Sequence, residues 1–258
     1  MKKALKISGI LAAIVALGSI SGCAGDAEEY DAVRDIREAY ELAEKSMDSQ
    51  NYRKAIGIFE ALQARFPFSD FAKEIQLRLM YCYYKVDRQD EAISAADQFL
   101  RENPTHPRVD YALYIKALTY FERDPSFLER WFRRDLEGRP PRDGELAFSL
   151  LRRLVERYPA SPYADDAQQR LIYLKNRLAA YENSVARFYI ERGAYVAALS
   201  RAKGALEQYN GAESSRESLE IMAEAYEGLG MTDLAADTRR ILELNFPTTA
   251  SRGTDNRK

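Results

Sequence analysis

The chain offers few side chains for covalent or metal chemistry: two cysteines, Cys23 and Cys82, and one histidine, His106. Nucleophilic catalysis needs a nucleophile, a base beside it and a third group that orients the base, and the sequence shows no such set. A lone histidine between Thr105 and Pro107 suits a turn better than a zinc site, which needs several clustered ligands. No glycine-rich phosphate-binding loop is visible either. We therefore predict no catalytic residue, no metal site and no cofactor, and expect a protein that is not an enzyme.

Cys23 is the residue for which the sequence predicts a covalent modification. Residues 1–6 carry three lysines, and residues 7–20 are apolar and uncharged, but this run is shorter than the roughly 20 residues of a membrane-spanning helix. It ends in Ile20-Ser21-Gly22-Cys23, which resembles a lipobox, where a diacylglyceryl group joins the cysteine thiol and signal peptidase cuts before it. We predict a lipoprotein signal peptide over residues 1–22 and a lipidated tether over residues 23–29. The alternative is an ordinary secretory signal with a chance cysteine.

Ala24 directly follows the lipidated cysteine and favours the outer membrane, because in enteric-type bacteria an aspartate there favours retention in the inner membrane. Several acyl chains on Cys23 give stable anchoring to lipid without a transmembrane helix. With Cys23 acylated, Cys82 has no cysteine to pair with, and its place within the apolar segment 79–84 suits a small buried hydrophobe. The net charge of −2 gives no reason to expect nucleic acid as a partner.

Helix pairs repeat along the mature chain. Residues 41–67 read as two amphipathic helices joined near Gln50-Asn51-Tyr52, and the second ends at Pro67, which cannot continue a helix. The next pair ends at Pro104, about one tetratricopeptide period later, a period of roughly 34 residues. Small residues stand where paired helices should cross closely: Ala43, Ala55, Ala92, Ala198, Ala223 and Ala235. Because one pair cannot bury its apolar face alone, we expect neighbouring pairs to stack.

The predicted fold is all-α: an α-solenoid of five tetratricopeptide helix pairs that winds into a right-handed superhelix. We expect the first two repeats within residues 30–106 and the other three within residues 107–247, followed by a disordered tail over residues 248–258. An insertion at residues 123–144 interrupts the third repeat. Residues 163–192 read as one helix, long enough to bend near Glu182-Asn183.

Several stretches go beyond a generic tetratricopeptide pattern. They are Arg65-Phe66-Pro67-Phe68, Tyr81-Cys82-Tyr83-Tyr84-Lys85, Asn103-Pro104-Thr105-His106-Pro107 and Tyr189-Ile190-Glu191-Arg192-Gly193-Ala194-Tyr195. Together they resemble the BamD (ComL/YfiO) family of outer-membrane β-barrel assembly lipoproteins, over roughly residues 40–247 and the lipobox. Residues 123–145 match that family poorly, so no contact is carried over for them.

The resemblance implies a binding subunit of the β-barrel assembly (BAM) complex, lipid-anchored on the periplasmic face of the outer membrane. Its partners would be the POTRA domains of a BamA-like subunit, held mainly by the C-terminal repeats, and the C-terminal signals of unfolded outer-membrane proteins, held by the N-terminal repeats. Other BAM lipoproteins join in some lineages. Two other classes stay open: a scaffold that coordinates peptidoglycan synthesis with envelope constriction, and a peptidoglycan-bound factor in DNA uptake.

The residues that would bind the signal peptide follow from the repeat template, in which the first helix of each pair lines the concave face. The predicted positions are Tyr40, Met47, Leu77, Tyr81, Tyr84 and Lys85. They would form an aromatic and apolar lip with a cation beside it, which suits an extended peptide that ends in an aromatic residue and a carboxylate. Alternatively, these tyrosines only stack between repeats.

In the C-terminal repeats, alignment with the family implies that Arg201 faces the BamA-like subunit, where an arginine can pair bidentately with a carboxylate. Otherwise Arg201 is a free surface arginine.

An acidic stripe recurs at helical spacing in the fifth repeat, and a solvated helix face explains it. Its members are Glu217, Glu220, Glu224 and Glu227.

The insertion carries an apolar stripe of its own. Its members are Phe127, Leu128, Trp131 and Phe132. We expect this stripe to fold back on to the solenoid rather than to enter a partner.

Overall fold

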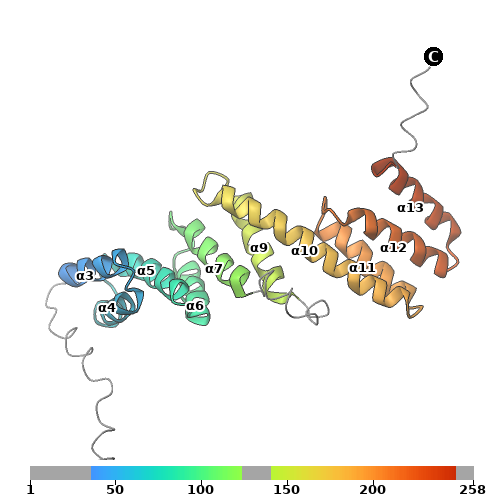
Figure 1. Ribbon diagram of the computed structural model, residues 1–258. Coiled ribbons are helices and arrows are strands. Elements are labelled where there is room, and N and C mark those ends of the chain that lie inside the picture. The colour runs from blue at the N-terminus through green and yellow to red at the C-terminus, as the bar shows by residue number, and fades with distance from the viewer. Residues whose placement is uncertain (1–35, 124–140, 248–258) are drawn as a thin grey trace, which may run out of the picture. The chain divides into compact units, whose positions relative to one another are not determined.

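The computed structural model describes residues 36–123 and 141–247, which form helices and the turns between them (Figure 1). Ten helices lie in these ranges, which confirms the predicted all-α fold of helix pairs. No helix within the same ranges is long and apolar enough to cross a membrane. The predicted signal peptide, Cys23 and its tether, the apolar stripe of the insertion and the tail at 248–258 lie outside the described residues.

Residues 36–88 form one compact unit, which we call unit 1. Its helices are α3 (Ile36–Asp48), α4 (Tyr52–Arg65) and α5 (Ala72–Lys85). The turn between α3 and α4 falls where the sequence predicted it, and Gln50 adopts a positive φ of 61° there. Asn51 Oδ1 accepts a hydrogen bond from Lys54 N at 3.2 Å. This bond satisfies one of the unpaired amides at a helix start, so Asn51 caps α4.

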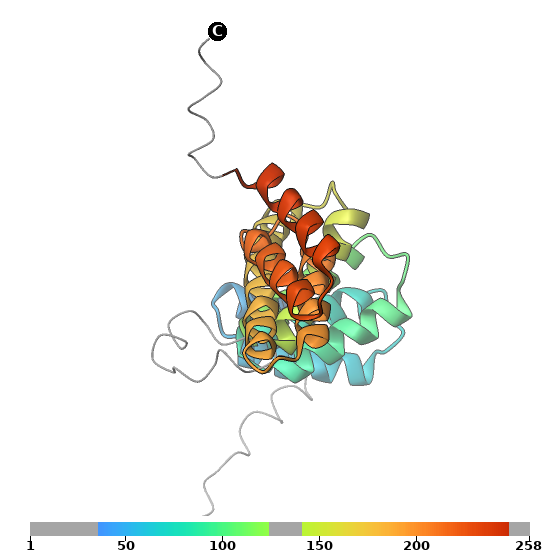
Figure 2. The same ribbon diagram turned by 90° about the vertical axis from the view of Figure 1, so that its right-hand side faces the viewer.

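Residues 89–247 form the second compact unit, unit 2. Its helices are α6 (Gln89–Glu102), α7 (Val109–Arg123), α9 (Arg142–Arg157), α10 (Ala164–Ile190), α11 (Tyr195–Gln208), α12 (Ser215–Gly228) and α13 (Thr232–Asn245). Figure 2 looks towards the end of this unit, where α13, in red, lies against α12.

The division predicted between residues 106 and 107 falls between α6 and α7 and stays a prediction about the repeats. The compact units divide one helix earlier, after Arg88, because α6 packs against α7 of unit 2. The third repeat is interrupted over a shorter stretch than 123–144, since α7 extends to Arg123 and α9 begins at Arg142.

Small side chains let the paired helices approach each other closely. The alanines predicted at the crossings are at most 4% exposed, which confirms their place in the core: Ala43, Ala55, Ala92, Ala198, Ala223 and Ala235. Larger side chains fill the wider gaps, and Phe59 in unit 1 and Leu174 in unit 2 are fully buried. At two turns of unit 2, Gly193 and Gly230 have φ values of 69° and 73°, a conformation that glycine adopts without steric cost.

Helix α10 is continuous over 27 residues. It runs through Glu182 and Asn183 without interruption, and Asn183 is fully buried. It contacts α9 of the third repeat and also α11 and α12 of the later repeats. One helix therefore serves two repeats, and it carries side chains of the C-terminal surface described below.

Candidate protein-binding surfaces

Three tyrosines and a lysine gather at the end of α5 in unit 1; we call Tyr52, Tyr81, Tyr84 and Lys85 the aromatic cluster. The rings of Tyr52 and Tyr81 meet edge to face with their centroids 6.0 Å apart, and those of Tyr81 and Tyr84 lie tilted at 6.4 Å. Lys85 Nζ lies 5.8 Å from the centroid of the Tyr52 ring. These distances allow aromatic and cation–π attraction. Three of the predicted binding residues are thus close together.

Helical spacing explains how the aromatic cluster forms. Tyr81, Tyr84 and Lys85 are three and four residues apart on α5 and therefore share one face. Tyr52 begins α4, directly after the cap residue Asn51, and α4 packs against α5. Tyr52 was missing from the predicted binding residues. The sequence could have indicated this residue. Tyr52 follows the turn within the first helix pair, and stacking of neighbouring pairs places that turn beside the first helix of the next pair.

Lys85 supplies a positive charge to the cluster. Its side chain is exposed, and it forms no ion pair with a residue inside the described ranges. Burial, and after it the neighbouring Tyr52, raises the pKa of Tyr81, so the Tyr81 hydroxyl stays protonated and can donate a hydrogen bond. A protonated hydroxyl and an ammonium beside aromatic rings form a chemically suitable site for a carboxylate next to an aromatic side chain.

Tyr40 of α3 makes a separate set of contacts. Its ring packs against Phe59 and Phe71, with centroids 5.7 and 5.1 Å away. Burial raises the pKa of Tyr40, although its hydrogen bond with Arg78 acts in the opposite direction. Arg78 Nε also lies 2.9 Å from Glu44 Oε1, an ion pair without hydrogen-bond geometry. The Arg78 charge is therefore matched within the chain, and the stacking alternative accounts for the contacts of Tyr40.

Leu77 and Met47 are less accessible than the repeat template predicted. Leu77 is only 2% exposed, so the expectation that its side chain lines an open groove was wrong. A helix inside a stack is covered on two sides, and its exposed stripe is narrower than the template assumes. Met47 is half-buried and packs against the core of unit 1. Peptide binding by either residue stays a prediction.

Arg201, the predicted partner-binding residue, lies on α11 of unit 2 and pairs with Glu182 of α10. Arg201 Nη1 lies 3.3 and 3.1 Å from the two carboxylate oxygens of Glu182. The Arg201 side chain is 46% exposed, whereas that of Glu182 is 15% exposed. The hydrogen bond to Glu182 raises the pKa of Arg201. Arg201 is accessible, but it is not the free surface arginine of the alternative interpretation.

Glu145 of α9 is a second carboxylate close to this pair. Burial raises the pKa of Glu145 and the charge of Glu182 raises it further, while Arg142 and Arg201 lower it. Burial, together with Glu145 and Glu182, also raises the pKa of Tyr209 to about 12. Arg201 is therefore paired with a carboxylate of α10, and its charge also lowers the pKa of Glu145 on α9.

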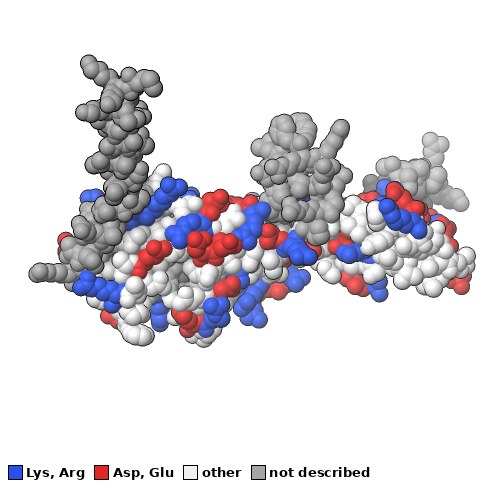
Figure 3. Space-filling view, turned by 90° about the horizontal axis from the view of Figure 1, so that it is seen from below, with Lys and Arg blue, Asp and Glu red and all other residues white. Residues whose placement is uncertain are grey.

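The acidic stripe of α12 is paired with arginines. The ion pairs are Glu217 and Glu224 with Arg187 at 3.5 and 2.7 Å, Glu220 with Arg216 at 3.0 Å, and Glu227 with Arg239 at 2.5 Å. Basic and acidic side chains are interspersed on the face that Figure 3 displays. The four glutamate side chains are 40–48% exposed, which agrees with a solvated helix face. Exposed ion pairs contribute little to stability, but the arginines offset the negative charge of the stripe.

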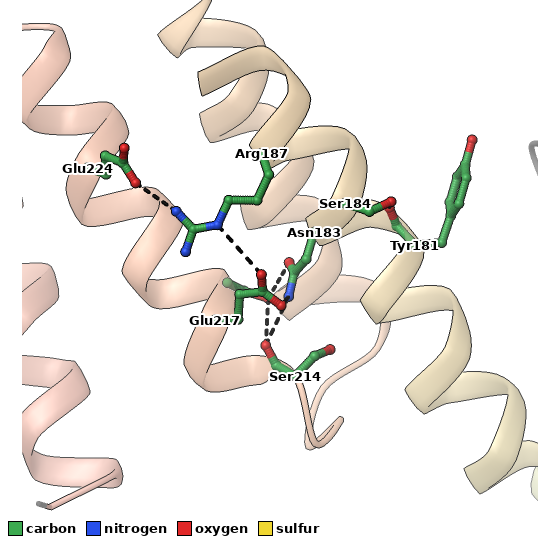
Figure 4. A network of polar contacts seen from close by, with 8 residues as sticks. Tyr181, Asn183, Ser184, Arg187, Ser214, Glu217 and Glu224 are labelled. Carbon is green, nitrogen blue, oxygen red and sulfur yellow. Dashed lines mark hydrogen bonds and ion pairs between the residues drawn. The ribbon is translucent and has the colours of Figure 1, made fainter. Parts of the chain in front are cut away.

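A polar network joins α10 to the start of α12 (Figure 4). Asn183 Nδ2 donates to the carbonyl oxygen of Ser214 at 3.0 Å, and Asn183 Oδ1 accepts from Ser218 Oγ at 2.8 Å. One turn further along α10, Arg187 reaches the acidic stripe. Because the amide of Asn183 is fully buried, these bonds specify how α12 lies against α10.

The helix pairs carry an aromatic cluster on unit 1 and a partnered arginine on unit 2. Such surfaces on stacked helix pairs are typical of proteins that bind polypeptides. In the described part of the chain, no three potential metal ligands of the His, Cys, Asp and Glu types come together. The fold and its surfaces are thus those of a tetratricopeptide-repeat protein, a class whose members bind other polypeptides.

Comparisons with known proteins narrow this class to one family. Residues 33–242 match the family model YfiO, described as an outer membrane lipoprotein. The outer membrane protein assembly factor BamD of Neisseria meningitidis serogroup A is 42% identical over 212 residues, which cover 82% of this chain and 79% of that relative. BamD of Vibrio cholerae is 38% identical over 237 residues, covering 91% and 97%. The chain belongs to the YfiO family of outer membrane lipoproteins, which confirms the resemblance to BamD.

Among solved structures, a thermophilic TPR protein of Thermus thermophilus is similar at 17% identity with a TM-score of 0.36, over 84% of this chain and 94% of that one.

Proposed function

We propose that the chain is the BamD-type lipoprotein subunit of a BAM complex and acts by binding other polypeptides, without catalysis of its own. Acylated Cys23 anchors it to the periplasmic face of the outer membrane. Unit 2 docks on the POTRA domains of a BamA-like subunit, and unit 1 binds the C-terminal signals of unfolded outer-membrane proteins so that they fold and insert. Other BAM lipoproteins are further partners in lineages that have them.

The observation that carries this proposal is how much of the chain its sequence similarity to an assembly factor covers. The match to the Vibrio cholerae assembly factor covers almost the whole of both chains, so the helix pairs of both units correspond rather than one generic repeat. An affinity pull-down from detergent-solubilised outer membranes tests it. We expect a large β-barrel subunit with POTRA domains to co-purify; recovery of a peptidoglycan synthase without that subunit would support the envelope-constriction scaffold instead.

The aromatic cluster supports the peptide-binding part of the proposal. A C-terminal aromatic residue offers a ring to Tyr81 and Tyr84 and a carboxylate to Lys85. We expect the double substitution Tyr81→Ala and Tyr84→Ala to weaken the binding of a peptide with a C-terminal phenylalanine about tenfold or more, which corresponds to roughly 1.4 kcal/mol. Fluorescence anisotropy of a labelled peptide measures this affinity.

Two controls separate binding at this cluster from general effects. Amidation of the peptide C-terminus removes the carboxylate and should weaken binding to the wild-type chain. Tyr173→Ala removes an exposed tyrosine from unit 2 and should leave the affinity unchanged. Equal affinity for the double variant and the wild type, with the helical circular dichroism signal retained, would discard the aromatic cluster as the peptide site.

A further inference from the structure

The turn between α4 and α5 holds one aromatic side chain away from the protein. Phe66 and Phe71 stand at the two ends of this turn and pack against the core of unit 1. Phe68, between them, is 98% exposed, more than any other large apolar side chain of the described residues. Because removal of apolar surface from water is favourable, contact with an apolar environment outside the chain would stabilise this ring, whereas the isolated fold gains nothing from it.

The backbone of the turn is ordered by hydrogen bonds. Ser69 N donates to the carbonyl oxygen of Phe66 at 3.2 Å, and Ala72 N donates to the carbonyl oxygen of Ser69 at 3.0 Å. Pro67 fixes its own φ angle. Phe68 therefore projects from a turn that is already formed, and a contact made by such a turn loses little free energy to the ordering of its backbone.

The turn lies at the same end of unit 1 as the start of α3. The guanidinium carbon of Arg37, in the first turn of α3, lies 5.9 Å from the centroid of the Phe71 ring, and the Tyr40 ring lies 5.1 Å from it. Cys23 precedes Ile36, where α3 begins, by 36 − 23 = 13 residues. A chain of that length spans at most roughly 45 Å, so a lipid anchor at Cys23 keeps this end of unit 1 close to a bilayer.

Exposed cations flank Phe68. Arg65 ends α4 and Lys73 lies in the first turn of α5, and neither forms an ion pair with a residue inside the described ranges. Asp70 is an exposed carboxylate between them, so the cations outnumber it. An apolar ring with cations beside it has the composition of segments that bind at a membrane interface, where anionic headgroups attract the cations.

The surroundings of Phe68 suit lipid better than a peptide. An extended peptide is held by an edge or a groove with pockets for its side chains. Phe68 makes no ring contact with another described residue, so no aromatic wall stands beside it. A bilayer needs no such wall, because its acyl chains close around a ring that enters from the headgroup side.

Resting on the lipid anchoring of Cys23 in the proposed function, we propose that Phe68 enters the phospholipid leaflet to which the chain is anchored and makes the α4–α5 turn a second membrane contact. The tether limits how far unit 1 moves from the bilayer but does not fix its orientation. A second contact point fixes which end of unit 1 faces the lipid. Because the anchor keeps the turn at a high local concentration near the surface, a weak contact is sufficient.

This contact orients the aromatic cluster. Tyr52 begins α4 and Arg65 ends it, so the cluster and the Phe68 turn lie at opposite ends of a helix of 14 residues, a length of roughly 20 Å. With Phe68 in the leaflet, the cluster points away from the membrane, where a peptide in water has access to it.

The experiment uses the full acylated chain in vesicles of phosphatidylethanolamine and phosphatidylglycerol. A bimane fluorophore on Ala64→Cys, in a Cys82→Ala background, reports the depth of the turn through quenching by lipids with brominated acyl chains. Ala64 is exposed and lies four residues before Phe68, and exposed Ser49 lies at the opposite end of unit 1. We expect quenching at position 64 to exceed quenching of the same label on Ser49→Cys about threefold or more, because roughly 20 Å separates the two ends.

Substitution of Phe68 tests the ring itself. Phe68→Ser should lower quenching at position 64 about threefold, because the ring supplies the favourable transfer from water, while Phe68→Leu should retain most of it. The helical circular dichroism signal should not change, since Phe68 makes almost no contact within the fold. Val196→Ser removes an exposed apolar side chain from unit 2 and should leave quenching at position 64 unchanged.

The outcomes separate this contact from the proposed function. Equal quenching at positions 64 and 49, or equal quenching with Phe68 and Phe68→Ser, in chains that still float with the vesicles would overturn the membrane contact and leave the anchoring intact. Unchanged quenching in Phe68→Ser together with weaker binding of the peptide with a C-terminal phenylalanine would also overturn it, and would assign Phe68 to peptide binding. Failure of the wild-type acylated chain to float with the vesicles would instead refute the anchoring, and this arm is measured first.

Discussion

Replacement of Asn183 by alanine removes the centre of the polar network between α10 and α12. Asn183 is fully buried, and its amide makes hydrogen bonds of 3.0 Å to the Ser214 carbonyl and 2.8 Å from Ser218 Oγ. Water cannot easily replace the amide at this depth, so both partners lose a hydrogen bond. Unit 2 should become less stable, and the position of α12 less defined.

The magnitude follows from these contacts. Each hydrogen bond contributes about 1 kcal/mol, and each buried group left without a partner costs about 1–3 kcal/mol. Ser218 Oγ keeps a second acceptor, the Ser214 carbonyl at 3.3 Å, which reduces the total. We therefore expect a loss of about 2–3 kcal/mol in the free energy of unfolding of unit 2. Asn176, two turns earlier on α10, bonds Glu213 in an exposed position, so Asn176→Ala should cost less than about 1 kcal/mol because water takes over these bonds.

Urea unfolding followed by circular dichroism gives the free energies by linear extrapolation. Two compact units need not unfold in one transition, so hydrogen exchange at the amides of α12 should be measured in parallel. Exchange in α12 should accelerate in Asn183→Ala while exchange in α4 of unit 1 stays unchanged. A loss below about 0.5 kcal/mol, or one no larger than that of Asn176→Ala, would refute the reasoning that the buried amide holds α12 in place.

Three further predictions concern other parts of the fold. Gly230→Ala should lower stability by about 1–2 kcal/mol, because the backbone of Gly230 is left-handed, with a φ of 73°. Gly204 lies inside α11, and a Cβ added there meets no atom within 4 Å, so Gly204→Ala should be neutral or stabilising. Melting temperatures that shift equally in the two variants would contradict this. Burial raises the pKa of the Cys82 thiol to about 12, so folded unit 1 should resist alkylation by iodoacetamide at about pH 8 and react only in urea. Rapid labelling of the folded chain would disprove the buried thiol. Because the pKa of Cys82 in the folded state exceeds the ordinary value of 9.0, the protonated thiol favours the folded state. The free energy of unfolding should therefore fall as pH rises above about 9, and it should fall less steeply in Cys82→Ala.

Most of the fold could be predicted from the sequence because its signals are local. Proline ends helices whatever surrounds it, alanines at regular spacing mark close crossings, and Asn51 provides a cap at the predicted turn. The division after Arg88 could not be predicted in the same way, since it depends on how tightly α6 packs against α7 compared with its other neighbours. Packing of that kind is a property of the assembled helices rather than of one segment.

The candidate surfaces were predicted less completely. Helical spacing on α5 placed Tyr81, Tyr84 and Lys85 on one face, and these do lie together, whereas Leu77 on the same spacing is buried. Tyr52 joins them from another helix, which a pattern within one helix cannot show. For Arg201, its own position was predicted from resemblance, but its pairing with Glu182 arises only when α10 and α11 lie side by side.

The length of α10 limits how this protein can be divided. Repeat proteins are often shortened at a boundary between repeats, where a loop can be cut without exposing a core. Here the passage from the third repeat to the fourth is a helix, and a cut within it would expose Leu174 or Leu178, which are buried. Fragments of unit 2 that end inside residues 164–190 should therefore be insoluble, and loosening at α9 should propagate along the continuous helix α10 to Glu182 and Asn183.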